Sequence, residues 1–149
     1  MTQWIFLLIA IAAGACLPLQ AGINSGLAKG LEHPLSAAFV SFGTGTLFLL
    51  AYLVVLRVPL PNPAKVATVP WWAWVAGGFL GAYYVSAALF LAPRLGATML
   101  VMTIVTGQIL VSVLLDHKGW LGYPEHPIKL GRLAGITCMV VGLFLIRRF

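Results

Sequence analysis

Charged side chains are scarce in this sequence. Only 3 of its 149 residues are Asp or Glu and 9 are Lys or Arg, so that 8% of the chain is charged while 61% is hydrophobic. Soluble domains carry about 25% charged residues, because their surface must be hydrated. The few charges also cluster, at positions 29–33, 57–65, 94, 116–132 and 147–148. This shortage excludes an ordinary soluble domain and predicts membrane spans joined by short loops.

Cysteine is also rare, and the residue patterns of enzymes are missing from the sequence. Cys16 and Cys138 both lie inside apolar runs, which is typical of small packing residues and not of a disulfide or a metal pair. No nucleophile triad, metal-ligating cluster or phosphate-binding glycine loop is visible. The net charge of +6 comes from single basic residues beside apolar segments and not from a basic stripe. We therefore expect no enzyme, no metal, no cofactor and no nucleic-acid partner.

Five apolar runs are long enough to cross a bilayer, which takes about 20 helical residues. The first run lacks the basic start of a signal peptide, so we interpret it as a span. The connecting loops are short, and the third and fourth spans are joined by a tight turn at 92–94. These loops leave no room for a catalytic domain outside the membrane. The sequence thus predicts an all-α integral membrane protein, with residues 1–149 forming a single five-helix transmembrane domain. The expected spans are residues 4–27, 35–56, 71–91, 95–115 and 128–146.

Basic residues are almost evenly divided between the two sides of the predicted membrane. The side of the N-terminus receives Arg57, Lys65, Lys118, Lys129 and Arg132, and the opposite side receives Lys29, Arg94, Arg147 and Arg148. The positive-inside rule orients a protein by an excess of such residues, and this balance gives almost no bias. One interpretation is that all copies of the protein insert in the same orientation, which the count of basic residues does not predict. The other is dual topology, in which copies insert both ways and pair as an antiparallel dimer.

Several short motifs carry a resemblance to a known family. The chain resembles the YdcZ-like proteins, small inner-membrane exporters of the drug/metabolite transporter superfamily. The resemblance extends over essentially the whole chain. The residues that carry it are Pro18–Asn24, Pro34–Ala38, Ser41–Thr46, Pro70–Trp74, Leu91–Ala97, Gly107–Gln108 and Leu115–His117.

This resemblance implies a multi-pass protein of the bacterial inner membrane that forms half of a ten-span drug/metabolite transporter fold. It also implies pairing with a second copy in antiparallel orientation, or with a homologous partner subunit. We therefore expect a transporter that exports a small metabolite or drug-like molecule by alternating access. A dual-topology ion channel and a non-transporting accessory subunit remain the alternatives. One departure is that the first span lacks the buried glutamate of the related small multidrug exporters, which argues against their proton-coupled mechanism.

Two carboxamides lie one helical turn apart in the first span. Gln20 and Asn24 share a helix face, and Pro18 beside them predicts a break in the helix. Freed backbone groups and amides can line a ligand cavity, whereas amides alone can simply hold two helices together. Both interpretations stay open, and Gln20 and Asn24 are the first candidates for the substrate pathway.

Polar side chains in the next three spans extend this candidate pathway. Hydroxyls in the second span either line the pathway or bond back to their own helix. Two adjacent tyrosines near the middle of the third span need partners for their hydroxyls. In the fourth span, an amide and a hydroxyl at i, i+4 lead toward the loop. These candidates are Ser41, Thr44, Tyr83, Tyr84, Gln108 and Ser112.

The fourth span ends at Asp116 and His117, which are candidates for proton or ion coupling because His titrates near neutral pH. The alternative is an ordinary helix end that meets water. Arg94 is expected to contact a lipid phosphate or another anion. Glycines at helical spacing predict close helix packing, and Gly135–Gly142 of the fifth span are our candidates either for a dimer contact or for a contact within the monomer. The packing candidates are Gly77, Gly81, Gly131, Gly135 and Gly142.

Overall fold

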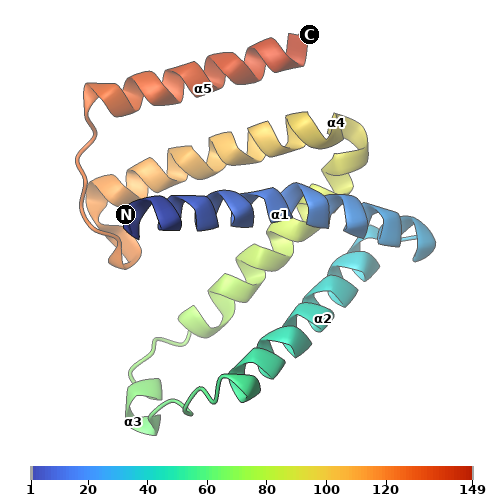
Figure 1. The fold of residues 1–149 in the computed structure, drawn as a ribbon, viewed down its shortest axis with the longest axis vertical. Coiled ribbons are helices and arrows are strands. Elements are labelled where there is room, and N and C mark those ends of the chain that lie inside the picture. The colour runs from blue at the N-terminus through green and yellow to red at the C-terminus, as the bar shows by residue number, and fades with distance from the viewer. Residues whose placement is uncertain (1, 149) are drawn as a thin grey trace. The chain divides into compact units, whose positions relative to one another are not determined.

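The computed structural model describes residues 2–148, and all of the regular elements in that range are helical (Figure 1). They are α1 (Thr2–Gly30), α2 (Pro34–Val55), α3 (Pro63–Val66), α4 (Ala73–Lys118), the 3-10 turn η1 (Trp120–Gly122) and α5 (Leu130–Arg148). The four long helices α1, α2, α4 and α5 are apolar enough to cross a membrane. The prediction of an all-α membrane protein is confirmed.

Helix α4 contains both the third and the fourth predicted span. Its 46 residues are too many for one crossing of a hydrocarbon core about 30 Å thick. Gly96, with φ 73° and ψ 164°, interrupts the helical backbone near the middle. The tight turn predicted at 92–94 is wrong, because those residues are helical and the interruption falls at Gly96. Glycine has no Cβ and adopts this positive φ without steric cost, whereas Arg94 and its neighbours would not.

The chain forms two compact units, one ending at Arg94 and one beginning at Leu95. In the first unit α1 contacts α2, and its core contains Ala37 and Ala38 of α2 and Leu89 of α4. Leu27 of α1 and Val85 of α4 pack against this cluster. Alanine allows helix backbones to approach closely, which explains why these small residues mark the helix contact.

The start of α2 is specified locally. Pro34 occupies the first turn, where its missing N–H costs nothing. The Nδ1 atom of His33 accepts a hydrogen bond from the backbone N–H of Leu35 at 3.2 Å. These two residues end the short turn after α1 and begin α2 one residue before the predicted position.

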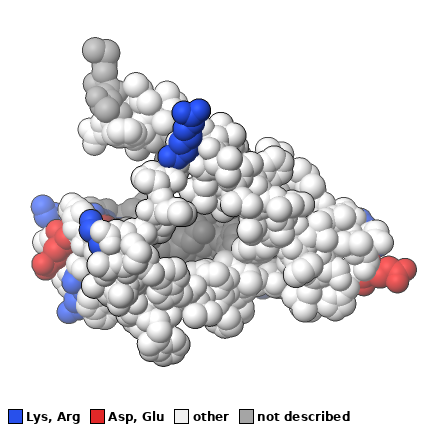
Figure 2. All heavy atoms as spheres, turned by 90° about the horizontal axis from the view of Figure 1, so that it is seen from below, with Lys and Arg blue, Asp and Glu red and all other residues white. Residues whose placement is uncertain are grey.

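Most apolar side chains of the long helices are exposed in the isolated chain. The buried hydrophobic residues in the described range are Ala37, Ala38, Ala88, Leu89 and Leu100. On the face that Figure 2 shows, wide uncharged areas separate a few charged side chains. A soluble protein would not leave so large an apolar surface in water. These surfaces therefore face lipid or another protein chain.

Candidate functional site

Among the described residues, Asn24 is the one polar residue that is buried, with 5% of its surface exposed. Its Nδ2 atom on α1 donates a hydrogen bond to Oγ of Ser41 on α2, over 3.1 Å. A hydrogen bond between membrane helices contributes about 0.6 kcal/mol on average, and an unpaired amide in hydrocarbon is costly. Of the two interpretations of Asn24, the one in which its amide holds two helices together is thus present in the structure. This hydrogen bond favours one rotation of α1 against α2.

A small cavity lies next to Asn24, between α1 and α4. Its volume is about 10 Å³, which is room for about one water molecule. Gln20 and Asn24 line it from α1, one turn apart, and Tyr84 lines it from α4. Three of the predicted pathway residues are therefore brought together at this point. The other lining residues are Leu17, Ala21, Val85, Ala88 and Leu89.

A larger groove of about 230 Å³ lies between α1 and α2, and Gln20 belongs to it as well. The α2 residues that line it are Ser41, Phe42, Gly45, Thr46 and Leu49, which lie around the middle of the 22-residue helix. The groove is therefore near the centre of the membrane if α2 crosses it. It is slightly smaller than the pockets of drug-sized ligands.

The lining of the groove is apolar with three neutral polar groups, Gln20, Ser41 and Thr46. The hydroxyl of Thr46 donates to the backbone oxygen of Phe42 at 2.9 Å, so its oxygen remains available to accept. Ser41 accepts from Asn24 and keeps its own proton to donate. The groove therefore offers donors and acceptors but no charge. Sequence reasoning missed Thr46, although it stands one turn after Phe42 on the face that carries Ser41 and Gly45.

Two predicted pathway residues of the first unit line neither of these spaces. The hydroxyl of Thr44 bonds back to its own helix, with backbone oxygens of Val40 and Ser41 at 2.9 and 3.0 Å. Tyr83 is 69% exposed on α4. A pathway role for Thr44 or Tyr83 would need a surface outside this unit, and it stays a prediction.

The helix break predicted at Pro18 is wrong. Helix α1 is continuous from Thr2 to Gly30, with Pro18 inside it. Proline removes one backbone donor, and the carbonyl four residues earlier loses its partner, but a membrane helix tolerates this loss. The polar character beside Gln20 and Asn24 therefore comes from their side chains and not from an unwound backbone.

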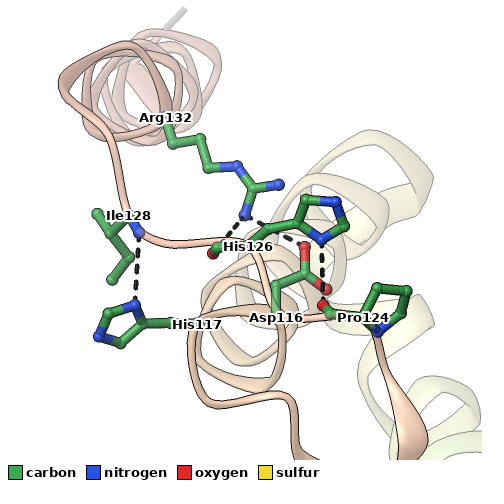
Figure 3. A network of polar contacts seen from close by, with 6 residues as sticks. All are labelled: Asp116, His117, Pro124, His126, Ile128 and Arg132. Carbon is green, nitrogen blue, oxygen red and sulfur yellow. Dashed lines mark hydrogen bonds and ion pairs between the residues drawn. The ribbon is translucent and has the colours of Figure 1, made fainter.

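The second unit contains a polar network at the end of α4 (Figure 3). The Nη1 atom of Arg132 lies 3.2 Å from Oδ2 of Asp116, and it also contacts the backbone oxygen of His126 at 3.5 Å. The N–H of His126 donates to the backbone oxygen of Asp116 at 2.7 Å. The N–H of Ile128 donates to Nδ1 of His117 at 3.4 Å.

This network gives Asp116 and His117 a structural task, because it holds the loop between α4 and α5 against the end of α4. It also provides Arg132 with a counterion at the start of the last span, where an unpaired charge would be unfavourable. Gln108 and Ser112 lie exposed on α4 in the same unit, and their part in a pathway stays a prediction. A role of Asp116 and His117 in proton or ion coupling also stays a prediction.

The predicted packing glycines differ in their surroundings. A Cβ atom at Gly81 would lie 3.4 Å from Cζ of Phe42 on α2, so α4 approaches α2 closely there. A Cβ at Gly142 would lie 3.9 Å from Cε of Met102. Apart from chain neighbours and the backbone of the same helix, no heavy atom of residues 2–148 lies within 4 Å of the Cβ positions of Gly77, Gly131 and Gly135. These three glycines therefore make no close side-chain contact within their own unit, and a packing role for them stays a prediction.

The guanidinium of Arg94 packs against its own helix. It stacks on the ring of Phe90, 3.8 Å from the centroid, and donates to the backbone oxygen of the same residue. This arrangement satisfies part of the side chain, and the predicted contact of Arg94 with a lipid or anion remains a prediction. Within residues 2–148, no three His, Cys, Asp or Glu side chains gather as a metal site would require.

Comparison with known proteins identifies the family. Residues 5–145 match the family described as "Putative inner membrane exporter, YdcZ". No curated protein and no solved structure was found to match the chain. The matched range includes all of α2, α3 and α4 and most of α1 and α5, and it confirms the resemblance found in the sequence motifs. The chain therefore belongs to the YdcZ family of inner-membrane exporters.

Proposed function

We propose that this chain is half of an exporter for small neutral molecules, and that two antiparallel copies transport by alternating access. The observation that carries the proposal is the groove between α1 and α2, where Gln20, Ser41 and Thr46 interrupt an otherwise apolar surface. Polar groups in a membrane helix are costly and usually face a cavity or another helix. Membership of an exporter family supports transport as their purpose.

We propose two copies because only α1 and α2 line the groove, and two helices cannot enclose a substrate on all sides. Transporters commonly bind their substrate near the midplane, between two repeats of inverted topology. The groove residues of α2 lie around the middle of that helix, which suits such a position. A chain with five spans and balanced basic residues can supply both repeats by inserting in both orientations. A homologous partner of opposite orientation would satisfy the same requirement.

Gln20 connects the two spaces of the proposed site. It lines the open groove toward α2 and the small cavity toward α4, where Tyr84 faces it. A solute in the groove would bond to Gln20 and to the free proton of Ser41, while the Asn24–Ser41 bond keeps α1 and α2 together. In this mechanism, α1 and α2 move as one body while the two copies rock about the site. The fifth span, with its open glycine face, would hold the copies together.

Export can be tested even before the substrate is identified. Cells that overproduce the protein are compared with cells that carry an empty vector, and untargeted mass spectrometry is applied to cell extracts and medium. We expect at least one neutral small molecule to increase several-fold in the medium and to decrease inside the cells. Ion currents across liposomes, without saturation, would indicate a channel instead. No change in any solute and no current would contradict transport by this chain alone and favour an accessory subunit.

A further inference from the structure

A second pocket, separate from the groove, lies where α2 ends. Its volume is about 480 Å³, and it is formed by the last turns of α2 and by residues 57–61 of the following loop. Leu50, Leu53, Val54 and Leu60 give it an apolar wall, and Arg57 is its charged residue. None of its lining residues belongs to the groove between α1 and α2.

The backbone at Arg57 is unusual. Its φ angle of 50° lies in the left-handed region, which glycine and asparagine occupy more easily than arginine. The N–H of Arg57 donates to Val54 and the N–H of Val58 donates to Leu53, at 3.1 and 3.0 Å, so that α2 ends in a closed turn. Backbone strain of this kind is common at binding sites, so the Arg57 side chain is a candidate for a binding role.

Within residues 2–148, the guanidinium of Arg57 forms no hydrogen bond or ion pair of its own. Two arginines of the described helices have partners within the chain, since Arg94 donates to the backbone oxygen of Phe90 and Arg132 pairs with Asp116. The loop from 56 to 72 contains Lys65 as a second cation and no Asp or Glu. A ligand at Arg57 should therefore be an anion that comes from outside the chain.

The pocket is at the depth of the lipid headgroups. Helix α2 has 22 residues, or about 33 Å at about 1.5 Å each, so a membrane about 30 Å thick has its headgroups at the ends of this helix. Trp71 and Trp72, at the other end of the same loop, are exposed aromatic residues of the kind found at that interface. An anion with an attached hydrocarbon chain is abundant there.

We propose that this pocket binds one phospholipid with an anionic headgroup. Its phosphate lies on Arg57, and one acyl chain runs along the apolar wall toward the membrane centre. Charge complementarity selects the headgroup, because phosphatidylglycerol carries a net negative charge and phosphatidylethanolamine does not. The bound lipid would fill the surface between α2 and its loop.

The test uses the full chain, purified in detergent, and native mass spectrometry with added phosphatidylglycerol or with phosphatidylethanolamine of the same acyl chains. We expect the wild type to bind phosphatidylglycerol more tightly, and Arg57→Gln to bind it about fivefold more weakly. Arg57→Lys keeps the charge and should keep most of the affinity. Lys65→Gln is the matched control, since it removes one charge from the same loop outside the pocket, and it should bind as the wild type does.

Three results would overturn the proposal. The first is unchanged phosphatidylglycerol binding by Arg57→Gln. The second is an equal loss in Lys65→Gln, which would assign the effect to the charge of the loop and not to the pocket. The third is full competition by glycerol phosphate, which has no acyl chain and would show that phosphate alone is recognised. Arg57 is exposed, and an unchanged elution profile of each variant verifies that it is folded.

Discussion

Replacing Gln20 with leucine is expected to reduce export by about 5- to 150-fold while the protein stays folded and paired. The amide of Gln20 is the group shared by the groove and the small cavity, and leucine has a similar volume but no hydrogen-bonding atoms. A site that loses a hydrogen bond to its substrate loses binding of about 1 to 3 kcal/mol, because the polar atom of the substrate is left unpaired. About 1.4 kcal/mol corresponds to a factor of ten.

The matched control for this prediction is Gln3→Leu. Gln3 lies on the same helix, 17 residues before Gln20 in the sequence, and lines neither space. Export is measured as the ratio of solute in medium and cells, normalised to the amount of protein in the membrane. Equal export by wild type and Gln20→Leu would contradict the proposed site. Loss in both variants would indicate a general effect of removing an amide from α1.

Replacing Gly81 with valine is expected to destabilise the first unit by about 1 to 3 kcal/mol, the usual effect of adding methyl groups to a packed contact. A Cβ at this position already lies in van der Waals contact with Phe42, so the additional methyl groups of valine would overlap the ring. Phe42 lines the groove, and its displacement should also reduce export. Alanine adds the Cβ alone and should be tolerated.

Gly78→Val provides the control for this substitution, because a Cβ at Gly78 has no heavy atom within 4 Å. Both variants change the helix propensity of α4 in the same way, and the difference between them reports the contact with Phe42. Unfolding by added denaturing detergent, followed by circular dichroism, measures the stabilities. Equal stability of the two valine variants would show that α4 and α2 do not approach at Gly81.

Hydropathy was enough to predict the helices of this protein. The first two predicted spans, 4–27 and 35–56, correspond to α1 and α2 with differences of a few residues at their ends. The reason is physical, since a membrane helix needs about 20 apolar residues and its loops need polar or helix-breaking ones. The sequence motifs around Pro18 and Ser41 also predicted the family to which the chain belongs.

The rotation of each helix could not be predicted in the same way. These helices are apolar on nearly all sides, so periodicity does not tell which face meets a neighbour. Asn24 and Ser41 were both candidates, but only the structure shows that they bond to each other. The helix break predicted at Pro18 and the turn predicted at 92–94 were wrong for a related reason. A proline can stay inside a membrane helix, whereas a glycine can interrupt one by a single positive φ.

The pairing of two inverted copies is the central claim, and the orientation of the chain in intact cells tests it most directly. A single cysteine is placed after the last residue in a background with Cys16 and Cys138 replaced by alanine, because both native thiols are free and exposed. An impermeant maleimide is then applied from outside, and a permeant one afterwards. Comparable labelling from both sides is the result we predict for a chain that inserts in both orientations. Labelling from one side only would contradict the antiparallel homodimer and would require an oppositely oriented partner protein.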